Sequence, residues 1–159
     1  MTHIEPTNPG GLEFKAHLEL SSNVGFLSVV RSTVEALTIE LGWSPEVAMS
    51  IKLAIDEALT NKIRHAYDSR PDGQIQIDIM TVRKGLVFQL SDQGKAPDMR
   101  RLCARKKLST EPGGLGTHII RDVMDEVVYE SVGVNNLLIM TKYFPASFPY
   151  PETAGEGNP

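Results

Sequence analysis

Two alternating segments joined by only three residues constrain the fold of this chain more than any other feature. Residues 75–82 and 86–92 each have the two-residue apolar–polar period of a half-buried strand, and Arg83-Lys84-Gly85 separates them. A connection this short allows an antiparallel hairpin but no helical crossover between parallel strands. The spacing therefore argues against a doubly wound parallel sheet.

The rest of the chain supplies further strands and helices around this hairpin. In chain order, the other predicted elements are a strand over 14–20, a helix after Ser21-Ser22-Asn23 that ends at Gly42, a helix from Pro45 to Tyr67 capped by Ser44, a short helix after Gly116, and a hairpin formed by 126–131 and 137–144. This order predicts an α/β (α+β) two-layer sandwich. A mostly antiparallel sheet of about five strands would be covered on one face by about three helices.

The chain length suits a single domain, which we place at residues 13–144. Residues 1–12 are predicted to be a flexible N-terminus, and residues 145–159 a disordered tail rich in proline and glycine. Residues 95–113 are polar and basic without a strong period. A connection of that length inside a small domain is usually functional or disordered, so we predict a lid over 95–113.

Composition narrows the class of function. A formal net charge of −4 gives no support for a nucleic-acid binder, which normally has a basic face. Lone Cys103 allows no internal disulfide, and the four histidines are scattered, which disfavours a transition-metal site. No apolar run approaches the roughly 20 residues that cross a bilayer, and the first residues lack the pattern of a secretory signal. We therefore expect a cytoplasmic protein without a membrane segment.

A polar stripe on the second helix is the first candidate for chemistry. At about 100° per residue, Glu57, Asn61 and His65 share one side next to the apolar face, and Asp56 points to the other side. A carboxylate can accept a proton from a hydroxyl there, and an amide oxygen can ligate Mg²⁺. Taken alone, the stripe also fits a solvent-exposed face. Lys62 lies inside the apolar face, where a small apolar residue is expected; a lysine can snorkel from a rim position, and the sequence gives no other account of it.

Two other segments suit a nucleotide. Asp92 ends a predicted strand and precedes Gly94, so its carboxylate can accept from a donor such as the adenine amine, although the same residues form common turns. Gly114 and Gly116 lead straight into a helix. Their backbone N–H groups and the helix N-terminus would form a cradle for phosphates, although a lone glycine pair often marks only a joint between loop and helix.

Together, these segments resemble the GHKL (Bergerat-fold) ATPases, and within them the anti-sigma-factor serine/threonine kinases, also called switch kinases. The resemblance rests on Glu57-Ala58-Leu59-Thr60-Asn61, Arg64-His65-Ala66-Tyr67, Asp92-Gln93-Gly94 and residues 113–127. It covers roughly residues 14–144 and implies a histidine-kinase-like ATPase fold that binds ATP with Mg²⁺. Ala96 departs from the pattern, because a second glycine often stands there.

The resemblance also implies a role for each matching residue. Glu57 matches the family's general base, Asn61 its Mg²⁺ ligand, and Asp92 its adenine-binding aspartate, with Gly94 beneath the base. Gly114 and Gly116 match the phosphate-side glycines, and Thr117 adds a hydroxyl contact to the nucleotide.

The function that follows from the resemblance is a serine/threonine protein kinase that is also an anti-sigma factor. It would phosphorylate a serine of a STAS-type anti-anti-sigma partner and, as a homodimer, sequester a sigma factor. The alternative is a non-catalytic binding module that senses ATP and switches partners without transferring phosphate. The presence of Glu57 favours the kinase.

Overall fold

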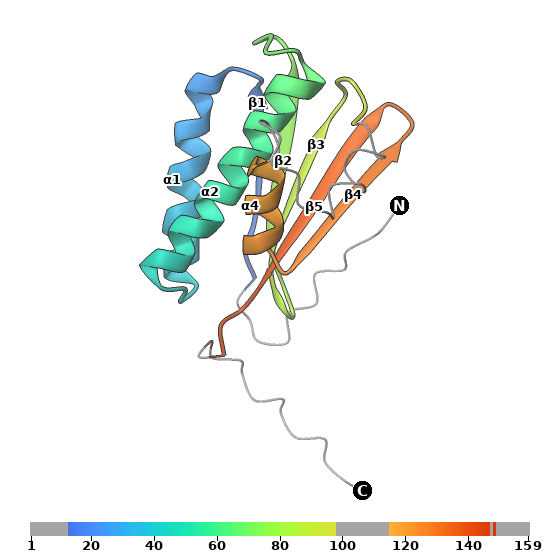
Figure 1. Ribbon diagram of the computed structural model, residues 1–159. Coiled ribbons are helices and arrows are strands. Elements are labelled where there is room, and N and C mark those ends of the chain that lie inside the picture. Colours follow the sequence, from blue (N-terminus) through green and yellow to red (C-terminus); the bar gives the residue numbers. More distant parts are fainter. Residues whose placement is uncertain (1–12, 98–114, 147, 149–159) are drawn as a thin grey trace, which may run out of the picture.

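The computed structural model describes residues 13–97, 115–146 and 148 (Figure 1). In chain order, its elements are β1 (Lys15–Ser21), the 3-10 helix η1 (Val24–Phe26), α1 (Leu27–Glu40), α2 (Pro45–Asn61), the π-helix η2 (Lys62–Ala66), β2 (Gln74–Val82), β3 (Gly85–Asp92), α4 (Leu115–Val123), β4 (Glu126–Val132) and β5 (Asn135–Tyr143). The expected flexible N-terminus, most of the expected lid over 95–113 and nearly all of the expected tail lie outside the described residues.

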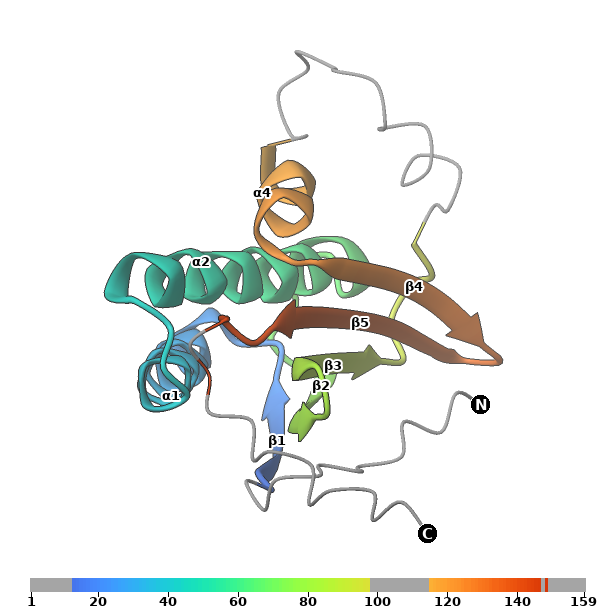
Figure 2. The ribbon, with the colours of Figure 1, turned by 90° about the horizontal axis from the view of Figure 1, so that it is seen from below.

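The strands form one sheet in the order β1-β2-β3-β5-β4, and every neighbouring pair in it is antiparallel. The helices α1, α2 and α4 lie on one face of this sheet (Figure 1), and the second view shows the helical layer beside the strands (Figure 2). This arrangement confirms the predicted two-layer sandwich. The prediction was of a mostly antiparallel sheet, and in the described residues every pair of neighbouring strands is antiparallel.

The core lies between the sheet and the helices, because the apolar side chains of the strands and those of the helices face one another there. In β2, every second residue, Ile75, Ile77 and Ile79, is fully buried. Ile51, Ile55 and Leu59 of α2 recur at helical spacing and belong to the same buried cluster. Burying such side chains contributes about 1.5–3 kcal/mol each relative to leaving them exposed.

The start of α2 agrees with the predicted capping. Ser44 is the N-cap, and its Oγ accepts a hydrogen bond from the Val47 N–H at 3.3 Å, while Pro45 occupies the first turn. Gly42 precedes the cap with φ +88°, a left-handed conformation that favours glycine after a helix. None of the described helices has the length and apolar character needed to cross a membrane.

The predicted single helix from Pro45 to Tyr67 is wrong beyond Asn61. There α2 ends, and Lys62–Ala66 form a π-helix, whose i→i+5 hydrogen bonds add about one residue to the turn. A π-helix leaves no signature in hydrophobic periodicity, because the pattern of only five residues is too short to show it. The angular positions that an α-helix would give to residues after Asn61 therefore do not hold.

Candidate functional site

Asp92 is the last residue of β3, the central strand of the sheet, and only 4% of its surface is exposed. The antiparallel register places it between Ile75 of β2 and Asn136 of β5. Its Oδ1 accepts hydrogen bonds from the Gly94 N–H and from the Asn136 side-chain amide, both at 2.9 Å. Its Oδ2 pairs with the Lys62 ammonium. A buried carboxylate requires such compensation by charge and hydrogen bonds.

Asn136 is a site residue that sequence reasoning missed. The pattern placed it in the hairpin turn Gly133-Val134-Asn135-Asn136, because glycine and asparagine are typical of turns. It lies instead in β5, with 5% of its surface exposed, and its Nδ2 also donates to the Gly94 carbonyl at 3.0 Å. Only the pairing of β3 with β5 brings it to Asp92, and no local signal in the sequence reports that pairing.

Gly94 lies against Ala66, the last residue of η2. A Cβ added to Gly94 would stand 2.5 Å from the Ala66 carbonyl oxygen and 2.7 Å from the Ala66 Cβ. The Lys95 N–H donates to that same carbonyl at 2.8 Å. The close approach of these two backbone segments therefore requires a glycine here. The expectation that Gly94 lies beneath an adenine base stays a prediction.

Lys62, the first residue of η2, reaches Asp92 from the helical layer. Its side chain is only 10% exposed, and its Nζ forms the ion pair with Asp92 Oδ2. Lys62 therefore does not snorkel to solvent in the structure, because its ammonium pairs with a buried carboxylate. Burial lowers the pKa of the Lys62 ammonium, against the opposing effects of the Asp92 charge and hydrogen bond.

Tyr67 braces the same region from the end of η2. Its ring is buried against Gly73, where an added Cβ would lie 2.2 Å from the ring. Its hydroxyl donates to the Gln74 carbonyl at the start of β2 and accepts from the Gln93 N–H at 3.3 Å. Burial raises the pKa of the Tyr67 hydroxyl. One side chain thus joins the helical layer to the two strand ends beside Asp92.

Glu57 and Asn61 lie one turn apart on α2, and both are half-buried. Asn61 is the last residue of α2 and directly precedes Lys62, so the structure places this end of the helix beside Asp92. Asp56 faces the other way, as predicted, and pairs with Arg31 of α1 at 2.7 Å. Glu57 and Asn61 of the predicted stripe therefore lie near the same end of α2 as Lys62, the partner of Asp92.

The predicted phosphate-side residues are only partly described. Gly116 and Thr117 belong to the first turn of α4, whereas Gly114 and the basic residues 100–107 lie outside the described residues. Helix α4 lies beside α2 on the same face of the sheet (Figure 2). The N-terminus of such a helix carries a partial positive charge, which suits an anion. The phosphate cradle itself stays a prediction.

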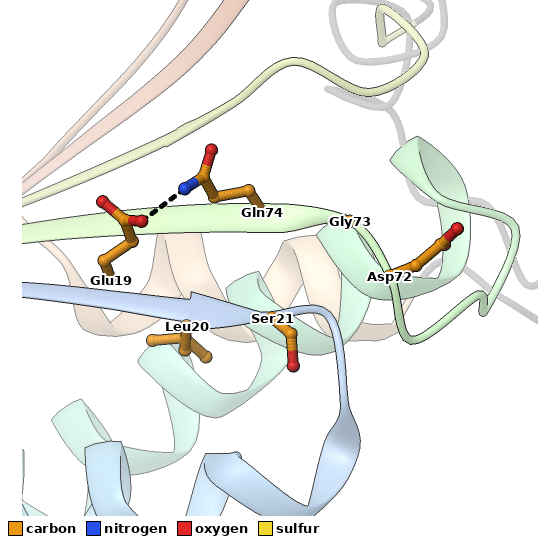
Figure 3. A pocket seen from close by; sticks show the side chains of 6 residues that line it. All are labelled: Glu19, Leu20, Ser21, Asp72, Gly73 and Gln74. Carbon is orange, nitrogen blue, oxygen red and sulfur yellow. Dashed lines mark hydrogen bonds between the residues drawn. The ribbon is translucent and has the colours of Figure 1, made fainter.

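Outside the region around Asp92, the described residues offer little for a ligand. Within the ranges that the structure describes, no group of three or more His, Cys, Asp or Glu side chains is arranged to hold a metal ion. A depression of about 410 Å³ lies where β1 ends and β2 begins, lined by Glu19, Leu20, Ser21, Asp72, Gly73 and Gln74 (Figure 3). Gln74 donates to Glu19 across it. Among the described site candidates, Glu57, Asn61, Asp92 and Gly94 do not line this depression.

A family model and several known proteins are similar to this chain. A family model described as a histidine kinase-like ATPase domain matches residues 20–142. The chain is 34% identical to an anti-sigma F factor of Geobacillus stearothermophilus over 122 residues, covering 72% of this chain and 82% of that protein. It is 29% identical to the serine-protein kinase RsbW of Listeria monocytogenes over 142 residues, covering 81% of this chain and 87% of the relative.

A solved structure shows the same fold. It contains the RsbU and RsbW domains of a Mycobacterium tuberculosis protein and has a TM-score of 0.58 at 15% sequence identity. The match covers 86% of this chain but spans only 34% of that longer chain. The matched family model, the relatives and the antiparallel sheet with its helical layer lead to one conclusion: the chain belongs to the family of histidine kinase-like ATPase domains.

Proposed function

We propose that this protein is an ATP-dependent serine/threonine protein kinase and anti-sigma factor. It phosphorylates a serine of a STAS-type anti-anti-sigma partner and sequesters a sigma factor. The observation that carries the proposal is the buried Asp92 carboxylate at the end of β3, next to the α2 end that bears Glu57 and Asn61. The relatives named as a serine-protein kinase and an anti-sigma factor support it.

The residues fit a nucleotide in kind. Asp92 supplies an acceptor for the adenine amine, and Gly94 keeps the following backbone close to the helical layer. Asn61 supplies an amide oxygen for Mg²⁺, which typically takes few protein ligands and keeps phosphate oxygens and waters. Gly114, Gly116 and Thr117 would bind the phosphates at the start of α4. When bound, ATP supplies the phosphoryl group that is transferred.

Glu57 is the proposed general base. A carboxylate at this place would orient the partner's serine hydroxyl and take its proton as the phosphoryl group is transferred, and such catalysis depends mainly on positioning and electrostatics. Its half-buried position on α2 leaves it accessible to a partner side chain. The neighbouring Asp56 is unsuited to this role, because its carboxylate is paired with Arg31 on the α1 side.

The nucleotide part of the proposal is tested by calorimetry with Mg²⁺-ATP. Asp92→Asn removes the charge from the acceptor and should weaken binding about tenfold or more, which corresponds to about 1.4 kcal/mol. Circular dichroism and a melting curve are needed to show that the variant folds. A folded Asp92→Asn variant that distinguishes ATP from purine riboside triphosphate, which lacks the 6-amino group, as strongly as the unaltered protein does would remove the adenine role from Asp92.

The catalytic part is tested by transfer of labelled phosphate from ATP to purified STAS-domain proteins of the same organism. Glu57→Gln should spare ATP binding and slow transfer by about 10²–10⁴-fold, the usual effect of a lost general base. Asp56→Asn is the matched control, because it neutralises the adjacent carboxylate on the opposite side of α2. ATP binding without transfer by the unaltered protein would instead support the ATP-sensing binding module.

The anti-sigma part and the homodimer are tested separately. Sedimentation of the purified chain should give the mass of a dimer, and co-purification with the sigma factors of the same organism should identify one that stays bound. Large apolar side chains are exposed on η1 and α1, namely Val24, Phe26 and Val29, and on α2, namely Met49 and Leu53. They offer apolar area for a partner. A monomer that retains no sigma factor would refute this part without affecting the kinase assignment.

A further inference from the structure

The Lys62 ammonium is bound to Asp92, the carboxylate that the proposed function needs as the acceptor for the adenine amine. Lys62 begins η2, and its side chain is 10% exposed, while that of Asp92 is 1% exposed. The two residues are 30 positions apart in the sequence, so the pair belongs to the fold and to no local turn. A charged group of the chain itself therefore covers the carboxylate that the adenine amine would use.

The acceptor capacity of Asp92 is largely used within the chain. Oδ1 accepts from the Gly94 N–H and the Asn136 amide, which fills its two lone-pair positions. Oδ2 accepts from Lys62 Nζ. A neutral amine that approaches Asp92 would have to replace or crowd the ammonium on Oδ2, and an ionised donor binds a carboxylate more strongly than a neutral donor does.

We propose that Lys62 is an internal competitor for Asp92 and thereby lowers the affinity of this protein for adenine nucleotides. The inference rests on the proposed function, because it takes Asp92 as the adenine acceptor. In the state described here, Lys62 holds the carboxylate. In the nucleotide-competent state, the side chain has left Asp92, and the amine takes its place on Oδ2.

Two properties of Lys62 make the exchange feasible. Its four-carbon stem rotates freely enough to carry the ammonium to solvent, and its remaining exposure shows that water is near. Burial removes hydration from the Lys62 ammonium, which is why it lowers the pKa of that group, and the hydration returns when the side chain leaves. The attraction between the two charges therefore opposes separation of the pair, whereas rehydration of the ammonium favours it.

The effect on affinity follows from the populations of the two states. The apparent dissociation constant rises by the inverse of the competent fraction. A lysine-bound state that holds about 90–99% of the protein would weaken apparent binding about 10- to 100-fold. Removing the ammonium should restore the intrinsic affinity.

The test compares Mg²⁺-ATP affinity by calorimetry for the unaltered protein and Lys62→Met, which keeps a long stem without the charge. We expect binding at least about tenfold tighter in the variant. Lys52→Met is the matched control, because Lys52 is a partly buried lysine of the preceding helix α2, paired with Glu35 at 2.8 Å. It should bind ATP as the unaltered protein does. Lys62→Arg, which keeps the charge, should not gain affinity.

A second nucleotide separates competition from a general effect on folding. Purine riboside triphosphate lacks the 6-amino group, so it gains nothing from a freed Asp92, and its affinity should not rise in Lys62→Met. Equal gains for both nucleotides would overturn the inference. So would unchanged or weaker ATP binding by Lys62→Met, because the lysine would then be neutral or would assist the base.

The unaltered protein offers a measurement that no variant can spoil by misfolding. An amine-reactive label should modify Lys62 slowly without nucleotide and faster with saturating Mg²⁺-ATP, as read by mass spectrometry of the digested protein. Slower or unchanged labelling with ATP would refute displacement. A failure of both the unaltered protein and Lys62→Met to bind ATP would instead contradict the proposed function, and the competitor role with it.

Discussion

Asn136 and Asp92 connect the beginning of β5 to the end of β3 through one hydrogen bond, from Asn136 Nδ2 to Asp92 Oδ1 at 2.9 Å. The same amide nitrogen donates to the Gly94 carbonyl at 3.0 Å. Because Asp92 also accepts from the Gly94 N–H, the three residues form a closed polar set at the end of the sheet. The set holds the carboxylate and the backbone after it in one geometry.

Asn136→Ala should therefore destabilise the protein. The substitution leaves the buried Asp92 carboxylate with one donor fewer and removes the donor to Gly94, which costs about 1–3 kcal/mol of the free energy of unfolding. Urea denaturation measures this loss. Asn135→Ala is the matched control, because the Asn135 side chain is exposed and accepts from the Gln93 amide at the surface at 3.1 Å, so the variant should lose about 0.5 kcal/mol or less. Equal losses would show that the polar set carries no special weight.

Gly94→Ala should destabilise the protein through overlap with Ala66. The new Cβ would meet the Ala66 carbonyl oxygen at 2.5 Å, and the backbone must move to relieve it, at a cost of about 1–3 kcal/mol. Ala66→Gly should not rescue the variant, because the carbonyl oxygen remains. Denaturation curves of the single and double variants decide the matter, and full rescue by Ala66→Gly would refute a backbone clash.

Much of the fold could be predicted from local patterns. The three-residue spacing between residues 82 and 86 fixes the β2–β3 hairpin, and Ser44-Pro45 fixes the start of α2. The pairing of β3 with β5 could not be predicted, because side-chain alternation says which face a residue occupies but not which strand lies beside it. The sheet order therefore had to come from the three-dimensional arrangement.

The site could be predicted only as far as single positions. Asp92, Glu57 and Asn61 lie on the predicted elements, at the strand end and on the polar side of α2. The environment of Asp92 could not be predicted, because Lys62 and Asn136 are 30 and 44 positions away from it. Helical spacing does place Lys62 on the apolar face, but it does not identify a buried partner for the ammonium, so spacing alone leaves solvent as its expected destination.

Ser22→Ala should destabilise the junction between β1 and β2. The Ser22 hydroxyl is buried, accepts from the Gly73 N–H at 3.0 Å and donates to the Arg70 carbonyl. Its loss leaves both backbone groups without that partner, at a cost of about 1–3 kcal/mol by urea denaturation. Ser28→Ala is the control, because the Ser28 hydroxyl is exposed and donates to the Gly25 carbonyl at 3.2 Å. A cost in Ser22→Ala no larger than in the control would contradict a structural role.

Tyr67→Phe should reveal a stability contribution that depends on pH. At pH 8, loss of the hydroxyl removes the hydrogen bonds to Gln74 and Gln93, at a cost of about 0.5–1.5 kcal/mol. Burial raises the pKa of Tyr67 above its ordinary value of 10.0, so the folded state favours the protonated hydroxyl more than the unfolded state does. A group with a raised folded pKa contributes fully below its unfolded pKa and loses that contribution as pH rises through the folded pKa.

The measurement is urea denaturation of the unaltered protein and Tyr67→Phe at several pH values from 8 to above 10. The difference in unfolding free energy should be constant up to about pH 10 and then shrink, because the phenylalanine variant has no hydroxyl to ionise while the unaltered protein must deprotonate a buried one. Other groups titrate in both proteins and cancel in the difference. A difference that stays constant across this range would show that the Tyr67 hydroxyl ionises as readily in the folded state as in the unfolded state. Burial between η2, β2 and the end of β3 would then have no effect on the pKa of the Tyr67 hydroxyl.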